Sequence, residues 1–247
     1  MTASESREIA DQPRVSSRER IRDAAEQIFA THGYEGASMR LIAEQAGVAQ
    51  ALLHYHFQNK DTLYAAVFER RSSTINERRS RLLDELFSNN KSPVLEDVLG
   101  ILFLPVVPFG EERQSDYDAF QQIVTAASVS SDLRSKELMT RYYDPIARRF
   151  IDAFQKVVPG LSEKSAIWSY LFALGARMQA QSRSNRAARL AGLSKGDDSA
   201  AVFAFLAAFV AAGIRTAALH GLPDETMKKP AKPVGRARRK QRVSANA

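Results

Sequence analysis

Residues 38–60, SMRLIAEQAGVAQALLHYHFQNK, decide the interpretation of this chain of 247 residues. Ser38 is suited to cap a short helix, and Gly47 is suited to end it because glycine readily adopts a left-handed backbone conformation. A second short helix is expected over about residues 49–56. Two short helices joined by a tight glycine turn are typical of a helix-turn-helix, whose second helix lies in the DNA major groove.

The second helix of this stretch has an inward and an outward face. Leu53 and Phe57 are four residues apart, so both are expected to point into a core. A major groove about 12 Å wide admits a helix whose side chains reach the base edges. The positions expected on or beside the outward face are Gln50, Ala51, Leu52, His54, Tyr55 and His56, with a partly buried packing role for the Tyr55 ring as an open alternative.

Two kinds of contact with DNA follow from the side chains alone. Arg40 and Lys60 carry positive charges that attract phosphates of any sequence. The Gln50 amide can form two hydrogen bonds with adenine and so distinguish it from other bases. A shared metal site is not expected, because His54 and His56 are two residues apart on a helix and face different directions.

Composition excludes several classes of protein. The chain has no cysteine, so it has no disulfide, thiol nucleophile or thiolate metal site. No P-loop or glycine-rich dinucleotide turn is present, so neither catalysis nor a cofactor is predicted. The N-terminus lacks an apolar segment typical of a secretion signal, and residues 200–212, the longest apolar stretch, are too few to span a bilayer.

The net charge of +7 is concentrated at one end of the chain. Residues 222–247 contain eight Lys and Arg against two acidic residues, which gives +6, whereas residues 15–60 balance at five against five. A basic tail with proline and no apolar periodicity is normally disordered. Nonspecific attraction to phosphates and a tail with no function are both open interpretations.

Helix signals recur along the chain, and no period-two run is long enough for a strand. We predict an all-α fold of about nine helices: an N-terminal three-helix DNA-binding domain followed by a C-terminal helical bundle. Pro145 is expected to kink or restart one helix, and Pro105 to close another. The residues expected to cap helices are Ser16 (with Glu19), Ser38, Asn59, Ser92 (before Pro93), Ser115, Asp132, Ser162, and Asp198 or Ser199.

The predicted domain organisation has four parts. A disordered tail of residues 1–15 precedes a helix-turn-helix domain of residues 16–64. A helical body of residues 65–221 follows, and residues 222–247 form the basic disordered tail.

Residues 16 to about 64 resemble the TetR-type transcriptional regulators. The family pattern I-A-x-x-A-G-V is followed by an aromatic-rich short helix and then F-x-x-K-[DE]-x-L. This chain matches it at Ile42-Ala43, Ala46-Gly47-Val48, Leu53 to Phe57, Lys60-Asp61 and Leu63. Ile28-Phe29 and His32-Gly33-Tyr34 fit as well. Beyond residue 64 the resemblance depends only on the number and order of helices.

The resemblance implies a role for each matching position. Ser38 and Arg40 would touch phosphate or a base; Gln50, Ala51 and Leu52 would face bases; His54, Tyr55 and His56 would lie against the backbone or bases. Lys60 and the amide at its helix start would hold a phosphate. Ala49 and Ala51 depart from the family, which commonly has Ser or Thr at the first position and often Gly at the second, so the operator is expected to differ from that of close matches.

The body is rich in aromatic residues, and polar residues such as Gln121 and Arg177 interrupt its apolar helices. The resemblance implies a small-molecule pocket there, although aromatic side chains at helical spacing are also typical of an ordinary core. Arg177 is the best candidate for a buried charge that meets a carboxylate or phosphate, with an inter-helix ion pair as the alternative. The predicted pocket residues are Phe103, Phe120, Tyr142, Phe150, Trp168 and Arg177.

The last helix is apolar on nearly every side, so most of its surface must be covered. The resemblance implies that two chains pair their final helices, which predicts a homodimer and a palindromic operator. The predicted interface includes Phe205, Phe209 and Ile214. A helix that is central in a monomer is the alternative.

The leading hypothesis is a transcriptional repressor that binds double-stranded DNA as a homodimer and is released by a small-molecule effector. The alternative is an architectural or cell-cycle DNA-binding protein of the same fold without an effector. The expected location is the cytoplasm, in association with the nucleoid, with no membrane partner.

Overall fold

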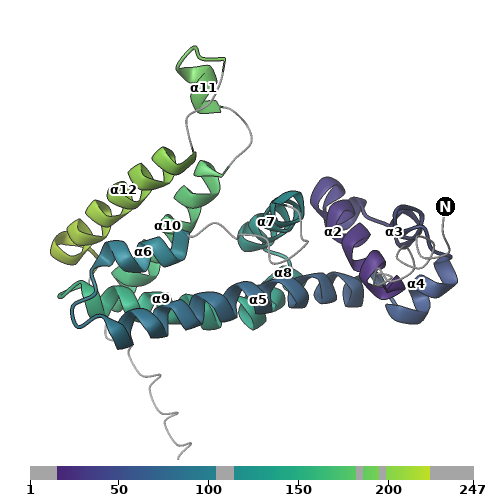
Figure 1. The fold of residues 1–247 in the computed structure, drawn as a ribbon, viewed down its shortest axis with the longest axis horizontal. Coiled ribbons are helices and arrows are strands. Elements are labelled where there is room, and N and C mark those ends of the chain that lie inside the picture. Colours follow the sequence, from purple (N-terminus) through teal and green to yellow (C-terminus); the bar gives the residue numbers. More distant parts are fainter. Residues whose placement is uncertain (1–15, 104–113, 182–185, 195–198, 223–247) are drawn as a thin grey trace, which may run out of the picture.

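The structure is a computed structural model that describes residues 16–103, 114–181, 186–194 and 199–222 (Figure 1). Eleven helices and no strand occupy the described residues, which confirms the all-α prediction. The two helices beyond the expected nine have simple origins. Pro145 restarts a helix rather than bending it, and a helix of five residues, α11 (Arg186–Leu190), has too few residues to show a periodicity.

The N-terminal head consists of α2 (Ser17–Gly36), α3 (Met39–Ala46) and α4 (Gln50–His56). Ser16 and Glu19 form the expected capping box, and the Ser38 hydroxyl accepts a hydrogen bond from the Leu41 amide. Gly47 has a φ of 62°, the left-handed conformation that the tight turn requires. Gly33 (φ 67°) interrupts α2 in the same way three residues before its end.

Helix α5 (Lys60–Asn89) connects the two ends of the molecule. Asn59 caps it as predicted, and its 30 residues run without a break across the predicted boundary at residue 64. Figure 1 shows the head at one end of α5 and helices α6, α9, α10 and α12 at the other. Movement of one end relative to the other must therefore involve this helix.

The body contains α6 (Leu95–Phe103), α7 (Gln114–Val129), α8 (Leu133–Tyr142), α9 (Asp144–Val157), α10 (Glu163–Ala180) and α12 (Ser199–His220). Asp132 and Ser162 cap α8 and α10 as expected. Ser92 does not cap α6, because the helix begins at Leu95 and the Asp97 carboxylate accepts the hydrogen bond from the Val94 amide at 3.0 Å. Ser115 lies inside α7, and Pro105 is outside the described residues.

Two hydrophobic cores divide the molecule. The first joins the head to the start of α5 and to α7, and the second joins α6, α9, α10 and α12. Helix α7 packs closely on α2, so a helix of the body directly supports a helix of the head. A cavity lies between the two cores and is lined by residues of both.

Candidate DNA-binding surface and ligand cavity

Helix α4 presents its side chains as the sequence pattern indicates. Leu53 and Phe57 are buried, at 0% and 3% exposure. Tyr55 is 80% exposed and Leu52 37%, and Gln50, Ala51 and His54 are exposed as well. The exposed set forms a free helical face at the end of the molecule farthest from α12 (Figure 1). That face has the dimensions of an element that enters a major groove.

The two histidines of α4 make separate contacts. A hydrogen bond of 2.9 Å joins His56 Nε2 to the Ser17 hydroxyl, so this half-buried ring ties α4 to the start of α2. The His54 ring lies 3.2 Å from the Gln58 carbonyl oxygen. No group of His, Asp and Glu suited to a metal ion occurs among the residues that the structure describes.

The start of α3 lies beside this face. The Ser38 side chain is occupied as a helix cap at 3.1 Å from the Leu41 amide. The exposed Arg40 guanidinium forms an ion pair of 2.7 Å with Glu44, one helical turn away. Exposed pairs of this kind contribute at most about 1 kcal/mol, so Arg40 can exchange Glu44 for a phosphate at small cost.

Lys60 has a structural role in addition to the one that the resemblance implies. Its ammonium donates hydrogen bonds to the carbonyls of Tyr34 and Ala37, at 2.9 and 3.0 Å, and lies 4.2 Å from the centre of the Tyr34 ring. A cation suits these carbonyls because the C-terminal end of a helix is electronegative. Contact with a phosphate by the Lys60 ammonium would require it to leave these partners.

A cluster of Tyr34, Asp61 and Arg134 joins head and body, and we call it the head–body cluster. The Tyr34 hydroxyl and the Arg134 Nε both donate to Asp61 Oδ1, at 2.7 and 2.6 Å. The Arg134 guanidinium also lies 3.4 Å from the centre of the Tyr34 ring. The hydrogen bonds from Tyr34 and Arg134 lower the pKa of Asp61, and burial raises the pKa of Tyr34 to about 12.

A buried ionic network joins α2 to α5. Glu26 is only 1% exposed, and its Oε2 accepts hydrogen bonds from Arg70 and Arg71, each at 3.0 Å. Arg70 also forms an ion pair of 2.7 Å with Asp23. Burial raises the pKa of Glu26, and the two arginines act against that increase. Sequence periodicity does not reveal this network, because its members are more than forty residues apart.

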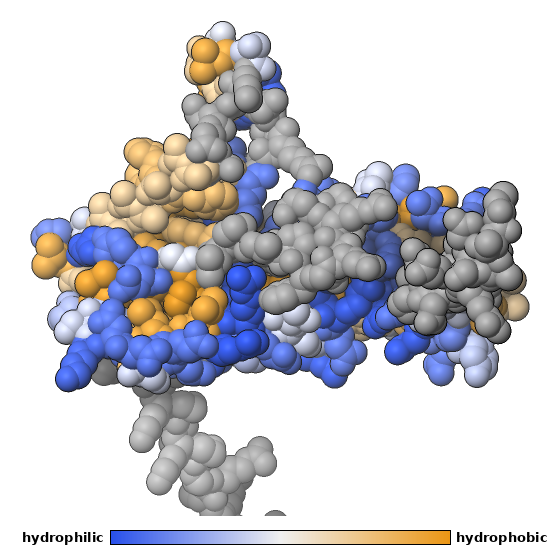
Figure 2. Space-filling model, viewed as in Figure 1, coloured by the Kyte–Doolittle hydropathy of each residue, from blue (hydrophilic) through white to orange (hydrophobic). Residues whose placement is uncertain are grey.

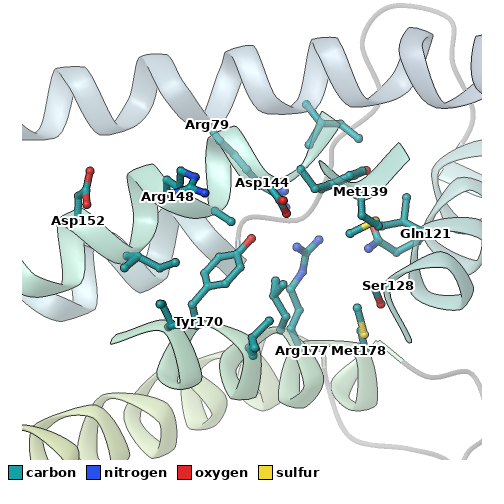
Figure 3. A pocket seen from close by; sticks show the side chains of 18 of the residues that line it. Arg79, Gln121, Ser128, Met139, Asp144, Arg148, Asp152, Tyr170, Arg177 and Met178 are labelled. Carbon is teal, nitrogen blue, oxygen red and sulfur yellow. The ribbon is translucent and has the colours of Figure 1, made fainter. Parts of the chain in front are cut away.

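A cavity of about 520 Å³ lies between α5, α7, α8, α9 and α10 (Figure 3). Arg79 and Arg177 reach into it from α5 and α10, and Tyr143 and Tyr170 line it as well. Burial raises the pKa of Tyr143 and raises that of Tyr170 to about 12, so both hydroxyls are protonated donors near neutral pH. Burial, followed by repulsion from Arg79, lowers the pKa of Arg177 to about 9.

Of the six predicted pocket residues, only Arg177 lines this cavity. Phe120 is buried in the first core, and Phe103 and Phe150 are buried in the second. The Tyr142 carbonyl accepts a hydrogen bond from Asn76, whereas the neighbouring Tyr143 lines the cavity. Trp168 is 45% exposed on α10. The three phenylalanine rings fill the cores because they bury much apolar surface, whereas two tyrosines and smaller aliphatic and polar side chains, including Gln121, surround the cavity.

The outer face of α10 and α12 is apolar and uncovered. Phe205, Phe209 and Phe172 are 72%, 65% and 67% exposed, and Figure 2 shows apolar side chains gathered over α12. Ile214 is different from the expectation, since it is 2% exposed within the second core of the same chain. It lies on the opposite side of α12 from Phe205 and Phe209.

Helix α12 is also longer than its uninterrupted apolar run. Within residues 200–220, a window of 18 residues has a mean hydropathy of 2.0, so the helix is long and apolar enough to cross a membrane. The sequence-based expectation that this segment is too short was based on residues 200–212 alone. The same length and composition are found in core helices of proteins that do not cross membranes, so this property does not by itself define the helix's environment.

The arrangement is that of a helix-turn-helix transcriptional regulator with a helical body. Two family models match the chain: "Bacterial regulatory proteins, tetR family" over residues 21–67, and "Tetracyclin repressor-like, C-terminal domain" over residues 101–213. The chain belongs to the TetR family of transcriptional regulators. Its relatives are regulators rather than enzymes.

Curated relatives match mainly in the head. The HTH-type transcriptional repressor AcnR of Corynebacterium efficiens is 40% identical over 57 residues, which cover 23% of this chain and 30% of that protein. The HTH-type transcriptional activator FasR of Mycolicibacterium smegmatis is 35% identical over 88 residues, which cover 30% of this chain and 40% of that protein. The chain thus matches less than half the length of these relatives.

Solved structures share the fold over most of the chain. HlyIIR, a hemolysin II transcriptional regulator, has a TM-score of 0.54 at 18% identity and covers 77% of this chain and 97% of its own. FadR from Bacillus subtilis in complex with stearoyl-CoA has a TM-score of 0.52 at 16% identity and covers 79% and 98%. At these identities the likeness establishes the fold alone.

Proposed function

We propose that the protein is a homodimeric repressor that binds a palindromic DNA operator and is released from it by a small-molecule effector. The observation that carries this proposal is the free face of α4, with Gln50 and Tyr55 exposed on a helix anchored by the buried Leu53. Ser38, Arg40 and the helix start at Lys60 lie around it and supply phosphate contacts. We place this activity in the cytoplasm, at the nucleoid.

The exposed apolar face of α10 and α12 supports the homodimer. Phe172, Phe205 and Phe209 expose large rings to solvent on adjacent helices, and exposed apolar surface of this extent marks an interaction site. Pairing α10 and α12 with the same helices of a second copy would cover it in a four-helix arrangement. The two-fold symmetry of such a dimer requires a palindromic operator.

The cavity supports an effector. Its volume of about 520 Å³ falls in the usual range for ligand sites, about 300–1,000 Å³. The fold neighbour FadR from Bacillus subtilis was solved in complex with stearoyl-CoA, so a regulator of this fold can bind a small molecule. A cavity of this size favours an effector-responsive regulator over an architectural protein with a filled body. Among the relatives, the AcnR proteins are repressors and FasR is an activator, and we propose repression.

Selection of genomic DNA fragments by the purified protein tests the central proposal. We expect a palindrome whose half-sites are separated by whole turns of DNA, about 10–10.5 base pairs each. Reporter expression in cells should rise when the gene is deleted if the protein is a repressor. Recovery of fragments without any shared sequence would contradict sequence-specific regulation. A fall in reporter expression on deletion of the gene would show that the protein is an activator and not a repressor.

The dimer is tested by a charge on its proposed interface. Phe209→Glu should convert the protein from dimer to monomer in analytical ultracentrifugation without detergent, because a carboxylate cannot be buried unpaired between two apolar faces. Operator affinity should fall with dimerisation. Val129→Glu is the matched control, since Val129 is 81% exposed on α7, away from the proposed interface. If the Phe209→Glu protein stayed dimeric, the dimer interface would not be the face of α10 and α12.

A further inference from the structure

One of the two arginines of the cavity, Arg177, lacks the hydrogen-bond partners that a buried charge requires. Arg177 is 3% exposed, and its Nε and Nη2 atoms have no hydrogen-bond partner. Its Nη1 lies 3.4 Å from the Leu102 carbonyl oxygen, which is a long hydrogen bond. Arg79, 9% exposed, lies close enough to repel it. Within the described part of the chain, neither guanidinium forms an ion pair with a carboxylate.

The acidic residues of the cavity are exposed rather than buried. Asp144 and Asp152 line it and belong to α9, and both are exposed, as is Glu163 at the start of α10. Figure 3 shows Arg79 and Arg177 extending from opposite sides toward the same space, with Tyr170 directed between them. The interior of the cavity thus presents two cations and donor hydroxyls. The exposed Asp144 lies close enough to Tyr170 to contribute to the increase in its pKa, but within the described residues no cavity carboxylate forms an ion pair with either arginine.

Such an arrangement is unfavourable in an empty cavity. A buried charge without a partner is strongly unfavourable because it has lost its hydration, and a like charge nearby makes it more so. A bound anion would remove the repulsion and fill the vacant hydrogen-bonding positions of Arg177. A carboxylate suits this role because its two oxygens accept hydrogen bonds from guanidinium groups in a planar arrangement.

The rest of the lining is apolar. Aliphatic and methionine side chains from five helices surround the charged centre: Ile75, Val124, Met139, Ile151, Leu174 and Met178. Methionine side chains adapt to ligands of different shape. The geometry points to an effector with one carboxylate and an extended apolar body, held by Arg177 and Arg79 at the carboxylate. This inference rests on the proposed effector function of the cavity and adds its chemical class.

Calorimetry with the full chain and a pair of simple probes tests it. Dodecanoate, below its micelle concentration, should bind at least about tenfold more tightly than dodecan-1-ol, since a charge-assisted hydrogen bond contributes about 1.5–3 kcal/mol and about 1.4 kcal/mol is tenfold. Arg177→Met should remove this preference. Arg148→Met is the matched control, because Arg148 lines the same cavity but is exposed, and it should keep the preference.

Two further measurements separate the possible outcomes. Circular dichroism of Arg177→Met should show a melting temperature no lower than that of the parent, so loss of binding is not loss of fold. Equal affinity for the acid and the alcohol, or an undiminished preference in Arg177→Met, would overturn the carboxylate assignment. Operator binding is measured on the same samples without probe, so failure of DNA recognition would be seen independently of the ligand class.

Discussion

The head and the body each bury a charged residue, but only the head supplies it with an oppositely charged partner. Glu26 in the head is 1% exposed; its Oε2 accepts hydrogen bonds from two arginines at 3.0 Å, and its Oε1 has no hydrogen-bond partner. Arg177 in the body is 3% exposed and has two nitrogen atoms without a partner. A buried charge whose partners are present holds the fold together, whereas one whose partners are missing indicates a position for a ligand. By this criterion Glu26 is a structural charge and Arg177 a functional one.

Removal of the Glu26 carboxylate should have the largest effect on stability. Glu26→Ala leaves Arg71, 5% exposed, buried without its carboxylate, and breaking a buried pair in this way costs about 3–5 kcal/mol. Urea unfolding followed by circular dichroism measures the loss. The matched change in the body is Arg177→Met, which should cause no loss of stability. Equal destabilisation by the two variants would show that Arg177, like Glu26, is a structural charge.

An exposed polar residue of the head should affect DNA recognition without affecting stability. Gln50 is exposed at the first position of α4 and contributes no packing, so Gln50→Ala should leave the unfolding free energy unchanged. It should cost about 1–3 kcal/mol of discrimination at one base pair of the operator if the amide contacts a base. Competition binding with operators changed at single positions measures this. A variant that discriminates as well as the parent protein would remove Gln50 from the recognition surface.

The helices of the head could be predicted from the sequence more completely than the cavity of the body. In the head, α2 and α3 begin or end at residues with a local signal, such as the capping box of Ser16 or the left-handed Gly47. These signals act over three or four residues, so those boundaries were predictable; α4 has no side-chain cap at Ala49 and was placed by the turn before it. The burial of Leu53 followed from helical spacing in the same way, whereas the exposure of Tyr55 did not, since a partly buried packing role for its ring was equally open.

The cavity depends on contacts between residues far apart in the chain, and no local pattern encodes them. Phe120 and Phe150 are as aromatic as a ligand site requires, yet both are 1% exposed in cores because the neighbouring helices cover them. The place of Arg177 in the cavity was predictable because a charged residue within an apolar helix indicates a buried charge. Its neighbour Arg79 was not predictable, since α5 carries many charged residues and only the fold distinguishes the buried ones, Arg71 and Arg79, from the rest.

Lys60 shows the same limit inside the head. A lysine at a helix start beside a DNA-binding surface is expected to bind phosphate, and the sequence contains nothing against it. The structure places its ammonium on the carbonyls of Tyr34 and Ala37 instead. Those carbonyls are available only because Gly33 turns the chain at the end of α2 and brings them to α5. Its role in DNA binding stays a prediction.

The smallest expected effect concerns the head–body cluster, which is paired but exposed and so lies between the two extremes. Arg134→Ala should lower the unfolding free energy at pH 7 by about 0.5 kcal/mol or less, as for other solvent-exposed ion pairs. The pKa of Asp61 is lowered in the folded protein, so its contribution is present above the ordinary carboxyl pKa of 3.8 and is lost as the pH falls below it.

The difference between the unfolding free energies of parent and Arg134→Ala should therefore shrink as the pH falls from about 3.8, the unfolded-state pKa, through the lower folded-state pKa of Asp61, in urea titrations from pH 7 to pH 2.5. Tyr34→Phe is the second variant, since it removes the hydroxyl that donates to Asp61 but keeps the ring under Arg134. A difference that persists unchanged at low pH would mean that the Arg134 guanidinium acts through its contact with the Tyr34 ring rather than through the carboxylate. The cluster would then be a packing contact between head and body, insensitive to charge.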